Sequence, residues 1–161
     1  MEINYCRGWF RARKVISEPI SEAEAHAAYE ARTLHTALIG DKSHPQCFVE
    51  VTGDSMAVGF LDAHLREFVC FNFQERRPGM LFLSMAVFRR FEGSSDKVIE
   101  GAVYFYKESG EAQVQKNYLI PTKETWEANT TLDVSANWEP YPQFGNYESI
   151  TRLDRGLQLI H

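Results

Sequence analysis

Apolar and polar residues alternate with a period of two along most of the chain, and this is the side-chain period of a β-strand. Six segments rich in Val, Phe, Tyr and Ile follow it: Cys47–Thr52, Ser55–Leu61, Arg66–Gln74, Met80–Phe91, Lys97–Lys107 and Glu111–Leu119. Turn-forming residues such as Gly53-Asp54 and Pro78-Gly79 separate them. Because a parallel return needs roughly a dozen residues or more, these short connections predict an antiparallel meander of about six strands over residues 47–119.

A helical period appears before the meander. Ser21, followed by Glu24 three residues later, has the pattern of a capping box at a helix start. Apolar residues then recur at helical spacing, at Ala27, Ala31, Leu34 and Leu38. The pattern predicts one amphipathic helix over about residues 21–39, ended by Gly40, since glycine tolerates the left-handed conformation. The aromatic and β-branched stretch Ile3–Ile16 predicts a further strand ahead of it.

Both faces of the segment Met80–Phe91 are apolar, with Leu83 and Val87 on one side and Phe82 and Phe88 on the other. A sheet covered by one helix normally leaves its other face polar. We therefore expect a second cover: curling of the sheet, the C-terminal segment or a second subunit. The predicted fold class is α+β, with the N-terminal strand and the helix packed on a curved, half-barrel-like meander sheet of six to seven strands. One domain is predicted to span residues 1–161.

The C-terminal third, residues 120–161, loses the regular period. Pro121, Pro140 and Pro142 interrupt it. It predicts an irregular, aromatic segment that wraps the sheet and holds one short strand near Ser149–Leu153.

Composition narrows the class of protein. The 161 residues are 44% hydrophobic, which predicts a packed core rather than disorder. The formal net charge of -5, with both signs scattered along the chain, argues against nucleic acid or an anionic membrane as the partner. The start of the chain shows no pattern of a secretory signal, and no apolar run is long enough to span a bilayer. The three cysteines read as buried free thiols, so a cytoplasmic location is expected.

Motifs for catalysis and cofactor binding are missing from the sequence. The five histidines and three cysteines show neither H-E-x-x-H nor C-x-x-C spacing, so neither a metal nor another cofactor is predicted. The best of the candidate nucleophiles is Cys47, near His44, but the sequence gives no further support for it. No G-x-S-x-G or nucleotide-binding loop occurs. No catalytic residue is assigned, and the protein is not expected to be an enzyme.

Aromatic and acidic residues gather in the C-terminal third, in a combination that protein interfaces use as anchors. The candidate partner-binding residues are Trp126, Glu127, Asp133, Trp138, Glu139, Tyr141, Phe144 and Tyr147. The alternative is that these rings close the open side of the sheet, and the two apolar faces of Met80–Phe91 favour that alternative.

Two stretches carry a resemblance to a known group of proteins. The run from EVTGDSMAVGF to GAVYFYK, followed by DVSANWEPYPQFGNYESITR, resembles small bacterial proteins that accompany polymorphic or contact-delivered toxins as presumed immunity partners. The likeness covers roughly residues 48–152. It implies neutralisation of a toxin by direct binding, without catalysis, in the cytoplasm.

Three hypotheses about function follow. The first is a non-catalytic binding protein of the immunity type, with a protein partner such as a toxin effector domain. The second is a small-ligand-binding protein or enzyme whose curved sheet encloses a pocket lined by rings such as Phe60, Phe71, Phe82 and Phe105. The third is a structural homodimer that covers the second face of the sheet with itself.

Overall fold

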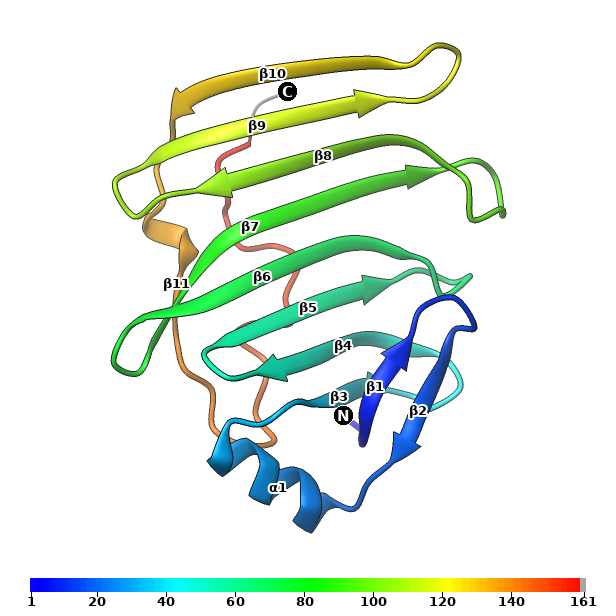
Figure 1. Ribbon diagram of the computed structural model, residues 1–161, viewed down its shortest axis with the longest axis vertical. Helices are drawn as coiled ribbons and strands as arrows, with labels where there is room; N and C mark the ends of the chain where they lie inside the picture. The colour runs from blue at the N-terminus through cyan, green and yellow to red at the C-terminus, as the bar shows by residue number, and fades with distance from the viewer. Residues whose placement is uncertain (160–161) are drawn as a thin grey trace.

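One open antiparallel sheet dominates the computed structural model of the protein, which describes residues 1–159 (Figure 1). Its strands are β1 (Ile3–Phe10), β2 (Val15–Pro19), β3 (His35–Gly40), β4 (Pro45–Thr52), β5 (Ser55–Leu61), β6 (Glu67–Arg77), β7 (Met80–Phe91), β8 (Val98–Tyr106), β9 (Glu111–Tyr118) and β10 (Glu124–Thr131). They lie in the order β10-β9-β8-β7-β6-β5-β4-β3-β1-β2. The short strand β11 (Trp138–Pro140) pairs with the start of β7.

The predicted meander is confirmed. Strands β4 to β9 match the six predicted segments to within about three residues at their ends. Each is antiparallel to the next along the chain. Alternating sequence and short turns therefore determine this part of the fold.

The α+β class and the long helix are wrong, because the described residues form a mostly β structure with a single short α-helix, α1 (Glu22–Ala31). Its start is as predicted, since the Ser21 hydroxyl accepts a hydrogen bond from the Glu24 amide at 3.1 Å. It ends early, at Arg32, which adopts the left-handed conformation with φ 53°. The residues expected to continue it form β3, which is buried along its whole length. A strand buried on both faces has no polar alternation, so its sequence does not distinguish it from a buried helix.

The number of strands and the curling of the sheet also need correction. The predicted strand Ile3–Ile16 is a hairpin, with β1 and β2 joined by a turn at residues 11–14. Strand β10 lies in the region expected to be irregular, and the strand expected near Ser149–Leu153 is instead a turn followed by non-regular chain. The sheet is open, with β10 and β2 as its two edges, and it does not close into a barrel.

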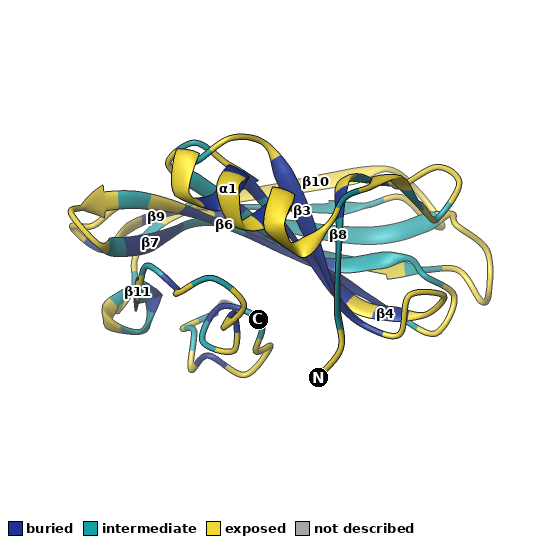
Figure 2. Cartoon of the chain, turned by 90° about the horizontal axis from the view of Figure 1, so that it is seen from below, coloured by how far each residue is buried: buried dark blue, intermediate teal, exposed yellow. Residues whose placement is uncertain are grey.

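The segment after β10, residues 132–159 and called the wrap below, covers one face of the sheet, here termed the back face (Figure 2). It docks on β7 through β11 and through Asn137, whose side-chain amide donates to the Leu83 carbonyl at 2.9 Å. Tyr29 of α1 joins the same core from below. Of the three covers considered for the second apolar face of the sheet, the C-terminal segment is the one observed. The last two residues of that segment, Ile160 and His161, lie outside the described part of the chain.

The opposite face, here termed the front face, is partly covered by the N-terminal hairpin. Figure 1 shows β1 and β2 crossing in front of β3 and β4. The hairpin places Trp9 against Phe48, with ring centroids 6.3 Å apart, in a second, smaller core. Gly59 makes room for this contact, because a Cβ there would lie 2.3 Å from Phe48 Cζ. No helix among the described residues has the length and apolar character needed to cross a bilayer.

Candidate functional site

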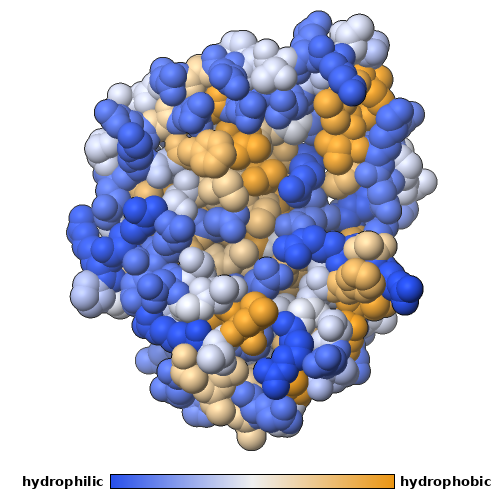
Figure 3. All heavy atoms as spheres, in the orientation of Figure 1, coloured by the Kyte–Doolittle hydropathy of each residue, from blue (hydrophilic) through white to orange (hydrophobic). Residues whose placement is uncertain are grey.

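Beyond the hairpin, the front face of β7 and β8 carries apolar side chains that no other part of the described chain covers. The register pairs Val87 with Val103 and Met85 with Phe105, and directly opposite residues of antiparallel strands lie on the same face. The Phe105 side chain is 43% exposed, whereas the other three are half-buried. These four residues are called the front patch below. In Figure 3, which looks onto this face, apolar atoms gather in its centre.

The alternation in β8 explains how this patch arises. Tyr104 and Tyr106 point to the back face and are buried in the main core, so Val103 and Phe105, which alternate with them, must point forward. A strand that is apolar on both faces therefore supplies the core on one side and the patch on the other.

Uncharged polar and acidic residues border the front patch along the sheet. Gln113 and Gln115 of β9 lie opposite Phe105 and Val103, and Asn129 and Glu127 of β10 follow them. Gln115 donates to the Glu127 carboxylate at 3.2 Å. The face thus has an apolar centre and a polar border.

A hollow of about 280 Å³ lies at one side of the front face, beneath the turn of the hairpin. Apolar and charged residues line it together: Trp9, Arg11, Ala12, Lys14, Leu61, Leu65, Arg66, Glu67, Phe91 and Asp96. Its walls come from the β1–β2 turn, the β5–β6 connection and the β7–β8 loop.

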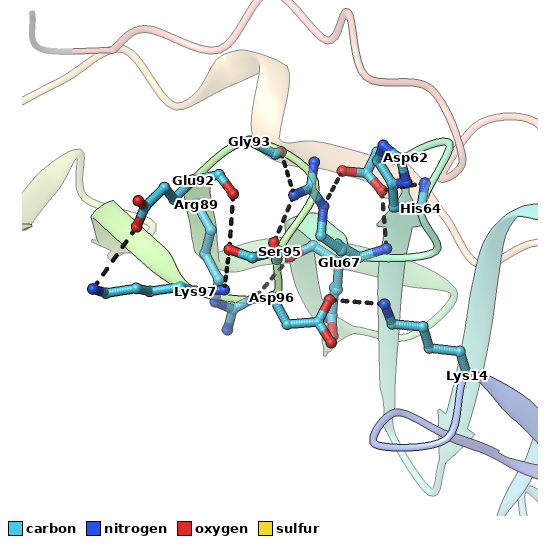
Figure 4. A network of polar contacts seen from close by, with 11 residues as sticks. Lys14, Asp62, His64, Glu67, Arg89, Glu92, Gly93, Ser95, Asp96 and Lys97 are labelled. Carbon is cyan, nitrogen blue, oxygen red and sulfur yellow. Dashed lines mark hydrogen bonds and ion pairs between the residues drawn. The ribbon is translucent and has the colours of Figure 1, made fainter.

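A polar network ties these three segments together (Figure 4). Lys14 Nζ lies 2.7 Å from Asp96 Oδ1 and joins the hairpin turn to the β7–β8 loop. Arg66 binds the Asp62 carboxylate and donates to the carbonyls of Gly93 and Ser95 at 2.8 and 2.7 Å. Burial raises the pKa of Asp62, but the hydrogen bonds from Arg66 and His64 outweigh burial and lower it.

The cations that line the hollow thus already have carboxylate partners. Arg11 lies 3.0 Å from Glu67, and Lys14 and Arg66 bind aspartates. An anionic ligand would have to displace these carboxylates. The arrangement is therefore better suited to holding the three segments together than to binding an anion.

The three thiols lie inside the protein and are poor nucleophiles. Burial raises the pKa of Cys6 to about 11, and the pKa of Cys47 and Cys70 to about 12. At neutral pH all three are therefore protonated, while nucleophilic attack requires a thiolate. Cys47, the best candidate nucleophile in the sequence, has no basic partner that lowers its pKa. Within residues 1–159, no three His, Cys, Asp or Glu side chains lie together as ligands for a metal ion.

The predicted partner-binding residues do not form one surface. Trp126, Glu127 and Asp133 are exposed, on β10 and just after it. Glu139 and Tyr147 are buried, so their assignment to a contact surface is corrected: they hold the wrap in place. Glu139 binds Arg155 and Arg152 at 2.6 and 2.7 Å.

The remaining predicted rings also belong mainly to the core. Tyr141 and Phe144 are half-buried and pack around Tyr29, with ring centroids 5.9 and 5.5 Å from it. Trp138 packs on Phe82 at 4.9 Å, and Arg77 covers its ring. The alternative considered for this cluster, that its rings close one side of the sheet, therefore describes most of it.

Sequence reasoning did not select the front patch. The signal was present in the two apolar faces of Met80–Phe91, but sequence alone does not tell which face the chain covers. Comparisons with protein-family models, with curated proteins and with solved structures find no match to this chain.

Proposed function

We propose that the protein is a non-catalytic binding protein that takes a protein partner on its front face. The observation that carries the proposal is the front patch, an apolar centre on a regular sheet that the described chain leaves open. Contiguous apolar surface with a polar border is typical of protein interaction sites.

The shape of this face favours a macromolecule over a small ligand. The rings expected to line a pocket pack against other rings instead: Phe60 lies 5.3 Å from Phe71, and Phe82 lies 4.9 Å from Trp138. Phe105 alone of that set stands on the open face. Small ligands bind mostly in concave sites that bury most of their surface, whereas an open sheet face suits a broad contact.

Within this class, we propose an immunity-type function in the cytoplasm, in which the protein neutralises a toxin effector domain by covering it. The resemblance over residues 48–152 supports this choice. The net charge of -5 is also suitable, because an acidic inhibitor associates faster with a basic effector.

The test is co-expression with the protein encoded beside this gene, after that protein has been shown to stop growth when expressed alone. Phe105→Glu places a charge in the front patch, and we expect it to abolish both the rescue of growth and the isolated complex. Leu34→Glu is the matched control, since Leu34 is 56% exposed but lies between α1 and β3, away from the patch. It should leave rescue and binding unchanged.

Two results would overturn the proposal. Full rescue by Phe105→Glu with an intact complex would show that the partner binds elsewhere. Loss of rescue by both variants to the same degree, with both folded, would show that the front patch has no special part in binding.

A further inference from the structure

Strand β10 is an uncovered edge of the sheet. It stands at the end of the strand order, and no strand of the described chain lies beyond it (Figure 1). It pairs with β9 over its whole length, from Glu124 opposite Tyr118 to Thr131 opposite Glu111, without a shift in register. Such a long, regular edge presents unpaired backbone groups to any strand that approaches it.

The residues with outward-facing backbone groups can be identified from one hydrogen bond. Leu132 donates its backbone N–H to the Gly110 carbonyl at 2.8 Å, which makes this pair a hydrogen-bonded one in the β9–β10 ladder. Hydrogen-bonded and non-hydrogen-bonded pairs alternate along antiparallel strands. The N–H and C=O groups of Thr125, Glu127, Asn129 and Thr131 therefore point away from β9, toward the free edge.

The opposite edge, β2, is protected by features that β10 lacks. It has five residues, and it ends with Glu18 in a left-handed conformation, φ 45°, followed by Pro19. Short edges, proline and distorted backbone are the usual devices against edge-to-edge association. β10 contains neither proline nor lysine, and its only charges are Glu124 and Glu127.

We propose that β10 pairs with the β10 strand of a second copy of this chain, antiparallel, about a two-fold axis at Ala128. A two-fold axis perpendicular to the sheet keeps each side chain on the same face in both copies. Such an axis passes between one residue of β10 and the same residue of the second copy, so one position of the strand pairs with itself. Centring on Glu127 would set two like charges opposite each other, which destabilises a strand pair. Centring on Ala128 sets Glu127 opposite Asn129 and Thr125 opposite Thr131 of the second copy.

This register uses the backbone groups of all four outward-facing residues. Glu127 with Asn129 of the second copy, and Thr125 with Thr131, are the hydrogen-bonded pairs between the two strands. It also covers Trp126, whose side chain is 42% exposed on the back side of β10, next to Lys116 at 5.4 Å from the ring centroid. In the pairing, Trp126 faces Thr130 of the second copy, next to the two Ala128 methyl groups. An aromatic and a β-branched residue on opposite strands form a favourable pair.

The geometry favours a closed dimer over a fibre. Each copy offers β10 once, and its other edge, β2, is blocked, so pairing stops at two chains. The front patch stays open in this arrangement, because it lies on β7 and β8, two strands away from the edge.

The test compares Asn129→Pro with the matched control Asn129→Ala, by sedimentation and light scattering at micromolar concentration. Proline removes an N–H that points outward, so the β9–β10 ladder is kept and only the pairing between copies is lost. We expect twice the chain mass for the wild type and for Asn129→Ala, and the mass of one chain for Asn129→Pro. Circular dichroism confirms that each variant is folded.

A second measurement holds even if the proline variant does not fold. Amide exchange in the wild type should slow with rising protein concentration at Thr125, Glu127 and Asn129. A wild type that stays monomeric, or that assembles only with a different protein, overturns the proposal. A folded Asn129→Pro that remains dimeric also overturns it, as does amide exchange at these residues that is independent of concentration.

Discussion

The guanidinium of Arg155 lies against the carboxylate of Glu139 within the wrap, with Nη2 2.6 Å from Oε1. The Arg155 side chain is fully buried and lies over the ring of Phe73, 5.0 Å from its centroid. Burial lowers the pKa of Arg155, and the nearby Glu139 carboxylate opposes that shift. The pair therefore fixes the C-terminal part of the wrap to β11, which is paired with β7.

Removing Glu139 should destabilise the protein strongly, because the Arg155 cation would remain buried without a counter-charge. For Glu139→Ala we expect a loss of about 3–5 kcal/mol in the free energy of unfolding, measured by urea denaturation. Glu148→Ala, at an exposed position of the same segment, is the control and should change it by less than about 0.5 kcal/mol. Equal effects of the two changes would contradict this account of the pair.

Gly59 should not tolerate a methyl group. A Cβ at this position would lie 2.3 and 2.5 Å from two carbon atoms of the Phe48 ring, which is held in place by Trp9. We expect Gly59→Ala to lower the free energy of unfolding by about 1–3 kcal/mol, the usual effect of overpacking. Gly101→Ala is a suitable comparison, because the nearest atom to a Cβ there is 3.6 Å away. If both variants unfold at the wild-type urea midpoint, the Phe48 ring moves aside without cost.

The thiols of Cys6, Cys47 and Cys70 should not react with a thiol reagent in the native protein. Their pKa values are raised to about 11 or 12 by burial, so the thiolate is scarce at pH values near 8. We expect no fast reaction with an aromatic disulfide reagent in buffer, and reaction of all three after unfolding in guanidinium chloride. A rapid reaction of one thiol in the native protein would identify an opening that reaches it.

The ion pair of Glu75 with Arg32 should contribute to stability at neutral pH and lose its effect in acid. Arg32 donates two hydrogen bonds to the carboxylate, at 2.7 and 3.1 Å, and these lower the pKa of Glu75 below its ordinary 4.5. A carboxyl group whose pKa is lower in the folded than in the unfolded protein stabilises the fold at pH values above its unfolded pKa. This contribution is lost as the pH falls through its folded pKa.

Glu75→Gln is therefore expected to cost less than about 1 kcal/mol at neutral pH, since Arg32 is partly exposed. The difference in urea midpoint between wild type and variant should shrink as the pH falls below about 4.5. A difference that stays constant into acid would mean that Glu75 does not titrate with folding.

The meander was predictable because its information is local. Turns such as Gly53-Asp54 and the alternation in Ser55–Leu61 specify both the strands and their antiparallel pairing. Strand β10 escaped prediction for the opposite reason. Its sequence, ETWEANTT, has little apolar alternation because the strand is an edge with mostly exposed side chains.

The end of the helix depended on information that the sequence does not display. Ala27, Ala31, Leu34 and Leu38 have helical spacing, yet only the first two lie in α1. The fully buried Leu38 gains its burial as part of β3, and the long-range pairing of β3 with β1 and β4 overrides the local pattern. For the candidate site, the sequence identified aromatic residues of the C-terminal third that could bind a partner. It did not show which of them the fold would bury.

The wrap has a consequence for how the protein reaches its native state. Asn137 and β11 dock on β7, so they have no binding surface until the strands of the meander have paired. On the ribosome, a nascent chain that has completed β9 would still expose to solvent the part of the back face that the wrap covers in the folded protein. We expect this interval, rather than the folded state, to be when the chain depends on chaperones.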